Sequence, residues 1–280
     1  MSTMNIDVDP GPEIGQTILA NAIATNYLQA GEGPPVVLVH GSGPGVSAWT
    51  NWRLNIPALA QRFTVYAPDL VGFGFTQRPA GTTYDLPTWR AHLLGFLDAL
   101  GLDRPSLVGN SFGGGLALST ATVAPDRVDK LVLMGATGVA FPLTPGLDAV
   151  WGYEPSYDNM SRLMDYFAHD RALVTEESTR ARYEASIRPG FQDSFAAMFP
   201  APRQRWIDAL TVPEDDVRAL QHETLILHGR DDQVIPPANA LRLLELIDRS
   251  EAHLFGRCGH WTQIEHAAEF NRLVGNFLAR

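Results

Sequence analysis

Six short apolar runs recur along the 280-residue chain, at Val36–Val39, Phe63–Tyr66, Ser106–Val108, Leu131–Met134, Leu225–His228 and Ala252–Phe255. The runs are continuous rather than alternating, and they are rich in Val, Leu and Ile. A strand buried on both faces of a parallel sheet carries this pattern. The runs therefore predict six strands of a largely parallel sheet.

Helical patterns separate several of these runs. Four leucines between Leu93 and Leu100 follow helical spacing, with Pro87 near the predicted start and Gly101 just past the end. A last helix is indicated by a stripe of apolar residues, at Ile264, Ala267, Phe270, Val274 and Phe277. Thr262 and Glu265 have the spacing of a capping box at its start. The alternation of strands and helices predicts an α/β fold, and the weakly alternating stretch Thr17–Gln29 predicts an antiparallel hairpin before it.

The middle of the chain breaks this alternation. Residues 141–205 hold many prolines and no clear buried strand, and 159–172 and 175–187 have helical patterns. We interpret 141–205 as a helical lid inserted into one core made of residues 1–140 and 206–280. The alternative is a separate small helical domain.

Composition narrows the class of partner. Thirty-one acidic and 21 basic residues give a formal charge of −10, which disfavours binding to nucleic acid or to anionic membranes. The single cysteine, Cys258, cannot form an internal disulfide or a cysteine zinc site. The first ten residues are polar and acidic, unlike a signal peptide, and no apolar run approaches the ~18 residues of a membrane span. We expect a cytoplasmic homo-oligomer with no nucleic-acid or membrane partner.

A nucleophile is indicated at Ser111. The segment from Gly109 to Gly113 reads G-x-S-x-G, directly after a predicted strand and before a helix, which is the context that this motif requires. A sharp strand-to-helix turn strains the serine backbone and needs small neighbours, and it presents Oγ at the positive end of the helix. The alternative is a glycine-rich turn that contains a serine by chance.

A serine hydroxyl needs a base, and the base needs a carboxylate. Of the eight histidines, His260 lies in a short loop between the last strand and the last helix, at the sheet edge where open α/β sites form. We expect His40 and His228, each at the end of a strand, to be structural. The acid should follow the preceding strand, where Asp231 and Asp232 are adjacent, and spacing does not decide between them. Cys258 does not lie in a strand-to-helix turn of the kind predicted at Ser111, so it is expected to be a small buried residue and not a nucleophile.

Two backbone N–H groups should stabilise an oxyanion. One belongs to Phe112, which follows the nucleophile, and the other comes from the glycine loop of residues 40–45 after the first parallel strand. Glycines let backbone N–H groups approach a ligand closely. The loop lacks the G-x-G-x-x-G and G-K-[ST] patterns, so a nucleotide site is disfavoured.

These motifs make the chain similar to α/β-hydrolases, and within them to the meta-cleavage product hydrolases, which split carbon–carbon bonds of aromatic ring-fission products. The segments that carry the resemblance are HGSGPGVSAWTNW (40–52), GFGFTQRP (72–79), GNSFGGG (109–115), ASIRPGFQDSFAAMFPAPRQRW (185–206) and CGHWTQIEH (258–266). The resemblance spans about residue 14 to the C-terminus and is greatest to the branch acting on 2-hydroxymuconate semialdehyde. Thr76 stands where many relatives have serine, away from the expected chemistry.

The resemblance implies particular roles. It makes Asp232 the acid of a Ser111–His260–Asp232 triad, and it places the oxyanion on the N–H groups of Ser42 and Phe112. It implies that Gly41, Asn51, Asn110, Arg188 and Trp261 bind an anionic dienoate, with Arg188 on its carboxylate.

The implied reaction hydrolyses the C5–C6 bond of 2-hydroxy-6-oxo-hexa-2,4-dienoates, such as 2-hydroxymuconate semialdehyde, in the degradation of aromatic compounds. The products are 2-hydroxypenta-2,4-dienoate and a carboxylic acid, and the reaction requires no metal or organic cofactor. An acyl-enzyme on Ser111 and water activated by Ser111 with His260 both remain open, as does the acid released.

Other functions fit part of the sequence. A generic carboxylesterase or lactonase, or a cofactor-free haloperoxidase-like relative, would use the same triad. Dehalogenases and epoxide hydrolases are disfavoured because they have aspartate where Ser111 stands. A catalytically dead binding module is disfavoured by the intact triad. Fold alone does not separate these functions.

Overall fold

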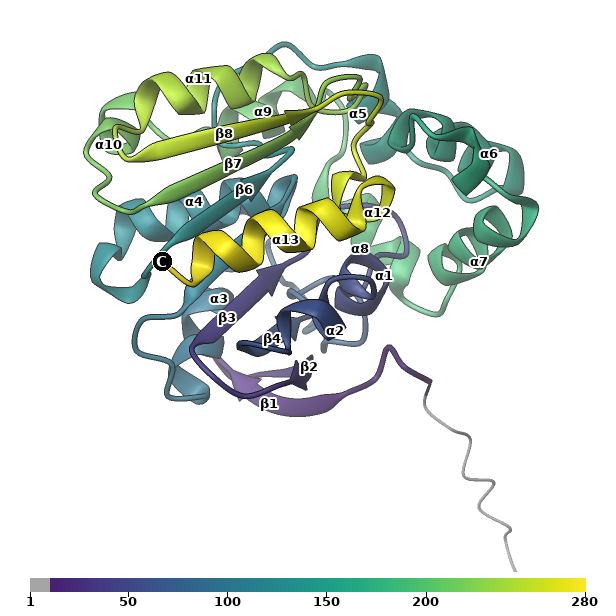
Figure 1. Ribbon diagram of the computed structural model, residues 1–280. Helices are drawn as coiled ribbons and strands as arrows, with labels where there is room; N and C mark the ends of the chain where they lie inside the picture. The colour runs from purple at the N-terminus through teal and green to yellow at the C-terminus, as the bar shows by residue number, and fades with distance from the viewer. Residues whose placement is uncertain (1–10) are drawn as a thin grey trace, which may run out of the picture.

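The computed structural model describes residues 11–280, so the expectation about a signal peptide in the first ten residues lies outside the described residues. An eight-stranded sheet of order β1-β2-β4-β3-β5-β6-β7-β8 forms the centre of the molecule (Figure 1). Its strands are β1 (Gln16–Ala20), β2 (Ile23–Ala30), β3 (Pro35–Val39), β4 (Thr64–Pro68), β5 (Ser106–Asn110), β6 (Leu131–Met134), β7 (Thr224–Gly229) and β8 (Ser250–Phe255). All six predicted parallel strands are present, and the hairpin prediction is confirmed by β1 and β2.

Strand direction follows the predicted scheme. β1 pairs antiparallel with β2, and β2 with β4, whereas every other neighbouring pair is parallel. The hairpin turns at Asn21 and Ala22, which both have positive φ, as the right-handed twist of a two-residue turn requires. The carboxyl ends of the parallel strands therefore meet at one edge of the sheet.

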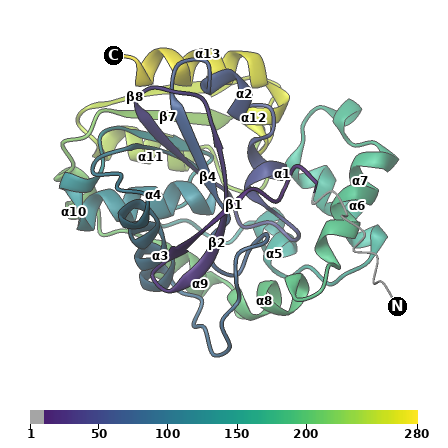
Figure 2. The ribbon, with the colours of Figure 1, turned by 90° about the horizontal axis from the view of Figure 1, so that it is seen from below.

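Helices cover both faces of the sheet. They are α1 (Ala48–Trp52), α2 (Ile56–Leu59), α3 (Leu86–Ala99), α4 (Phe112–Val123), η1 (Pro125–Arg127), α5 (Pro145–Trp151), α6 (Tyr157–Phe167), η2 (Arg171–Leu173), α7 (Glu176–Ser186), α8 (Phe191–Met198), α9 (Gln204–Leu210), α10 (Glu214–Arg218), α11 (Ala238–Leu246), α12 (Thr262–Glu265) and α13 (Ala267–Leu278). Figure 2 shows α2 and α13 on one side of the sheet and α3 and α4 on the other.

The central parallel strands contribute to two apolar clusters, one on each face of the sheet. In β3, Val36 and Leu38 pack with α1, α2 and α13, whereas Val37 and Val39 pack with α3 and α4. Successive side chains of a strand point to opposite faces, which explains why the predicted runs are continuous.

Residues 141–205 hold helices α5 to α8 and no strand. α6 and α7 lie at one end of the molecule (Figures 1 and 2). Their apolar residues, such as Met160 and Phe167, belong to the same cluster as Phe112 and Leu116 of the core. One continuous apolar cluster therefore joins this segment to the sheet domain.

Two details of the helix predictions are wrong. The helix expected over 159–172 ends at Phe167, since Ala168 is extended. The last helix is interrupted at His266, and Thr262 lies inside α12 and does not cap it. The Glu265 carboxylate accepts hydrogen bonds from the Gly259 and Asp170 N–H groups, both at 2.7 Å, and so joins the His260 loop to the segment after α6.

None of the helices in residues 11–280 combines the length and apolarity that a membrane crossing requires.

Candidate active site

Ser111 occupies a strained turn between β5 and α4. Its φ of 56° lies in the left-handed region, which costs a non-glycine residue on the order of 1–3 kcal/mol. The Ser111 N–H donates to the Met134 carbonyl at 2.8 Å and so ties the turn to β6. A Cβ at Gly113 would overlap the carbonyl oxygens of Val39 and His40. Gly113, two residues after the serine, thus lets α4 start directly against β3.

Asp232 and His260 meet at the carboxyl end of the sheet. His260 Nδ1 lies 2.8 Å from Asp232 Oδ2, and both side chains are buried. The adjacent Asp231 is partly exposed and lies 3.4 Å from Arg230. The structure therefore brings Asp232 to His260 and turns Asp231 away. Ser111 and His260 line one pocket, which is consistent with a nucleophile and its base.

The Asp232 carboxylate accepts several hydrogen bonds. Oδ1 accepts from the Val234 and Ile235 N–H groups at 2.8 and 3.0 Å, and His228 Nε2 lies 3.2 Å from Oδ2. Burial alone would raise the pKa of this carboxyl, but His260 and His228 more than offset it and hold the pKa well below its usual range. Asp232 is therefore ionised and fixed in orientation, as an acid that orients a base must be.

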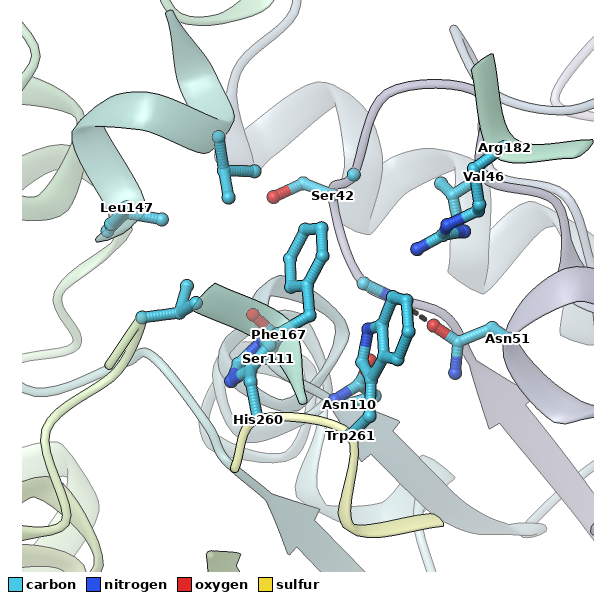
Figure 3. A pocket seen from close by; sticks show the side chains of 14 residues that line it. Ser42, Val46, Asn51, Asn110, Ser111, Leu147, Phe167, Arg182, His260 and Trp261 are labelled. Atoms are coloured by element: carbon cyan, nitrogen blue, oxygen red, sulfur yellow. Dashed lines mark hydrogen bonds between the residues drawn. The ribbon is translucent and has the colours of Figure 1, made fainter. Parts of the chain in front are cut away.

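Fourteen residues line the pocket around Ser111: Gly41, Ser42, Gly43, Val46, Asn51, Asn110, Ser111, Leu147, Val150, Phe167, Arg182, Val234, His260 and Trp261 (Figure 3). The set includes the expected residues of the glycine loop, the two asparagines and Trp261. Phe112 is buried beneath it as the first residue of α4, where helix N–H groups have no intrahelical partner.

Gly41 lets the glycine loop lie against the strand-to-helix turn at Ser111, which we call the elbow. A Cβ at this position would be 2.8 Å from Asn110 Oδ1 and 3.4 Å from Ser111 Cβ. The next residue, Ser42, accepts a hydrogen bond on Oγ from Trp151 Nε1 of α5 at 3.0 Å. The loop is therefore held between the elbow and the inserted helices.

Two buried amides present free donors. The Asn51 Oδ1 atom accepts from the Gly41 N–H at 3.1 Å, which aims its Nδ2 elsewhere. Among the described residues, neither Asn51 Nδ2 nor Asn110 Nδ2 has a hydrogen-bond partner. A buried amide without a partner is costly, so both donors are suited to an oxygen-rich ligand.

The structure does not bring Arg188 into this pocket. Arg188 follows the end of α7 and pairs with both oxygens of Glu13, at 2.8 and 3.1 Å. Arg182, six residues earlier and within α7, lines the pocket instead. Its guanidinium lies 4.8 Å from the centroid of the Trp261 ring, and burial lowers its pKa to about 10. No carboxylate of residues 11–280 forms an ion pair with Arg182.

The other expected residues have structural surroundings. His40 is buried, with Nδ1 2.8 Å from the Gly41 carbonyl and Nε2 accepting from the Leu70 N–H, and burial lowers its pKa to about 4. The Cys258 thiol is buried, and this burial raises its pKa to about 12, so it is not a thiolate nucleophile.

Three contacts were not predicted. These are His228 with Asp232, Trp151 with Ser42, and the Phe167 carbonyl with the N–H groups of His260 and Trp261 at 2.8 and 3.2 Å. The sequence spacing contains a signal for Arg182, because Thr179, Arg182 and Ala185 lie on one face of α7. Arg188 lies beyond the end of this helix. No local signal marks the other contacts.

Comparisons with known proteins agree with this geometry. A family model described as alpha/beta hydrolase fold matches residues 34–267. The 2-hydroxy-6-oxo-2,4-heptadienoate hydrolase of Pseudomonas putida is 62% identical over 267 residues, covering 95% of this chain and 97% of the relative. The 2-hydroxymuconate semialdehyde hydrolase of Pseudomonas sp. strain CF600 is 58% identical, covering 96% and 95%.

A solved structure is also similar. A mutant meta-cleavage product hydrolase of Pseudomonas fluorescens IP01, complexed with acetates, has a TM-score of 0.95 and 59% identity, covering 95% of this chain and 98% of that one. The chain therefore belongs to the α/β hydrolases, and within them to the meta-cleavage product hydrolases.

Proposed function

We propose that the protein hydrolyses the C5–C6 bond of 2-hydroxy-6-oxo-hexa-2,4-dienoates in aromatic degradation, releasing 2-hydroxypenta-2,4-dienoate and a carboxylic acid. The observation that carries the proposal is one pocket that joins a serine–histidine pair to a guanidinium and two free amide donors. In Figure 3, Arg182 and Asn51 lie on the right of Trp261, and His260 and Ser111 lie on its left. The first group suits a carboxylate, and the second suits a reacting carbonyl.

In this proposal Arg182 takes the role that the family resemblance gave to Arg188. The Arg188 charge is matched by Glu13, whereas Arg182 has no carboxylate partner in the described chain. A carboxylate on a partly desolvated guanidinium forms a strong, charge-assisted pair. Asn51, Asn110 and Trp261 then surround the dienoate.

The chemistry starts with ketonisation of the 2-hydroxydiene, which places a proton on C5. His260, oriented by Asp232, takes the Ser111 proton as Oγ attacks the C6 carbonyl, and the N–H groups of Ser42 and Phe112 hold the oxyanion. Collapse breaks C5–C6 and leaves the bonding pair on a dienolate, which takes the proton from His260 and becomes the dienol product. Water then hydrolyses the Ser111 ester with His260 as base. Rapid quench tests this route, because it traps the ester, whereas direct water attack leaves Ser111 unmodified at full turnover.

The pocket holds little free space. Its free volume is about 20 Å³, roughly the space of one water molecule. A ring-fission product therefore needs the side chains around it to move. We propose that residues 141–205 act as a lid, which supplies four of the lining residues, Leu147, Val150, Phe167 and Arg182.

The C6 substituent should be small. Leu147 lies on the opposite side of Phe167 from Arg182 (Figure 3), and Val150 and Val234 add further apolar wall. The substrate in the name of one relative, 2-hydroxy-6-oxo-2,4-heptadienoate, carries a methyl group at C6. We propose hydrogen or methyl at C6, and formate or acetate as the acid.

The test is decolorisation of yellow ring-fission products that carry hydrogen, methyl, isopropyl or phenyl at C6, with products identified by mass spectrometry. We expect fastest turnover with hydrogen or methyl. Turnover of neutral aryl esters without decay of any dienoate would favour the generic esterase or lactonase.

We also propose a cytoplasmic homo-oligomer. The free thiol of Cys258 fits a reducing compartment. Exposed leucines at 241 and 244 of α11 and at 254 of β8, the edge strand packed beside α11, support self-association. Light scattering tests it: a monomer at micromolar concentration would contradict the proposal.

A further inference from the structure

A second cavity lies beside the reaction pocket. It has a volume of about 370 Å³, and Arg182 and Trp261 line both cavities. The short helix α1 also borders both, because Asn51 lines the inner pocket and Trp49, Thr50 and Arg53 line the outer cavity. The outer cavity is therefore separated from the inner pocket by side chains of Arg182 and Trp261.

This partition is held by weak contacts. The Arg182 guanidinium packs over the rings of Trp261 and Phe167, at 4.8 and 5.7 Å from their centroids, and the two rings stack at 4.9 Å. A cation–π contact contributes about 0.5–2 kcal/mol, so the guanidinium can swing aside on the timescale of side-chain motion. The inner pocket is too small for a substrate as it stands. The outer cavity is the free space that adjoins this pocket.

The outer cavity is positively charged in a protein of net charge −10. Three guanidinium groups line it, those of Arg53, Arg182 and Arg188, against the carboxylates of Glu13 and Glu184. Glu13 is committed to Arg188. The exposed Arg53 donates only to the Thr50 carbonyl, at 3.0 Å, and forms no ion pair with a carboxylate of residues 11–280.

Arg53 and Arg182 carry like charges on the wall of the same cavity. The pKa of Arg182 is lowered first by burial and then by the charge of Arg53, and the charge of Glu13 raises it in part. Two guanidinium groups held in this way stabilise an anion placed between them, and such local fields raise the association rate of charged ligands.

We propose that the outer cavity is an encounter site for the substrate carboxylate, with Arg53 as the receiving cation. The carboxylate then passes from Arg53 to Arg182 as the contact of Arg182 with Trp261 opens. Arg53 touches no reacting atom, so it affects capture and not chemistry. This inference rests on the proposed function, since it assumes an anionic dienoate.

The test compares Arg53→Gln with Arg62→Gln, which removes the same charge at an exposed site beside Asn276 that does not line the outer cavity, and with Arg53→Lys, which keeps the charge. We expect Arg53→Gln to lower kcat/KM for the dienoate about three- to tenfold at low ionic strength, with kcat within twofold of wild type. The loss should shrink in about 0.5 M salt, where the Debye length falls to roughly 4 Å. Arg62→Gln, Arg53→Lys and the hydrolysis of a neutral aryl ester should change less than twofold.

Equal kcat/KM values for Arg53→Gln and Arg62→Gln, or a matching fall of kcat, would overturn the encounter site. Wild-type turnover is measured in the same series and separates the two proposals. Wild-type enzyme that leaves the dienoate intact contradicts the proposed function, whereas normal wild-type turnover with an unaffected Arg53→Gln variant contradicts the encounter site alone.

Discussion

The Nε2 atom of His228 lies 3.2 Å from Oδ2 of Asp232, the same oxygen that pairs with His260. The Ile235 carbonyl oxygen is 3.0 Å from that Nε2 atom. Because both neighbours are acceptors, Nε2 of His228 carries the proton. His228 is therefore a second histidine donor to the triad acid and helps to hold its carboxylate in line with His260.

Removing this donor should slow catalysis without changing substrate preference. We expect His228→Leu to lower kcat about 10- to 100-fold. The loss should be the same for dienoates and neutral aryl esters, because the substitution frees the Asp232 carboxylate to move and leaves the contacts to the dienoate unchanged. His228→Gln, which can place an amide N–H near Nε2, should recover part of the loss. Steady-state kinetics on both substrates check this, and a loss confined to dienoates would assign His228 to substrate binding.

Loss of Arg182 should be selective for anionic substrates. We expect Arg182→Met to lower kcat/KM for dienoates at least about 100-fold, since a charge-assisted bidentate pair contributes about 3 kcal/mol or more, and to leave neutral aryl esters within about fivefold. The matched control is the double variant Glu13→Gln with Arg188→Met, which removes the neighbouring ion pair without changing net charge. If the double variant showed the selective loss and Arg182→Met did not, the carboxylate would belong to Arg188.

The elbow should not tolerate a methyl group at residue 113. Gly113→Ala would place Cβ against the Val39 and His40 carbonyls, so α4 must move away from β3. We expect at least about 3 kcal/mol of lost stability in urea unfolding. The control Gly101→Ala has positive φ but no atom within 4 Å, and should cost only about 1 kcal/mol. Equal losses would show that α4 relieves the overlap at residue 113 at little cost, which contradicts a steric requirement for glycine there.

Stability should fall in mild acid. Burial lowers the pKa of His40 and of His92 to about 4, so the unfolded chain binds these protons first and stability is lost as pH falls from about 6.5 toward 4. Asp69 acts in the opposite sense, since burial raises its pKa to about 6 and the folded state takes up that proton first.

The net effect can be measured by urea unfolding at pH 7 and pH 5. Each histidine should cost about 2 kcal/mol over this interval and Asp69 should return about 1 kcal/mol, so wild type should lose about 3 kcal/mol. His92→Gln should lose only about 1 kcal/mol over the same interval. An undiminished loss in this variant would show that His92 does not take up a proton on unfolding.

The sequence predicted what short-range rules determine. Continuous apolar runs located the six parallel strands, and G-x-S-x-G located the turn at Ser111, because burial and steric fit leave a local pattern. The Thr262–Glu265 spacing predicts a capping box, but Glu265 instead accepts from the Gly259 N–H across the His260 loop, a use that the spacing does not distinguish. Arg182 and Arg188 are six residues apart in one segment, and only the end of α7 at Ser186 and the pairing with Glu13 separate their environments. The contact of His228 with Asp232 depends on the path of the chain after β7, which leaves no composition signal.

The central claim is serine-dependent cleavage of a carbon–carbon bond in an anionic dienoate. Stopped-flow decolorisation of 2-hydroxymuconate semialdehyde and of its 6-methyl analogue tests it most directly, with wild type and Ser111→Ala compared at matched folded concentration. We predict rapid decay by wild type with equimolar 2-hydroxypenta-2,4-dienoate and acid, and decay at least about 10³-fold slower in Ser111→Ala. Turnover of Ser111→Ala within tenfold of wild type, or no decay of either dienoate with wild type, would contradict the account.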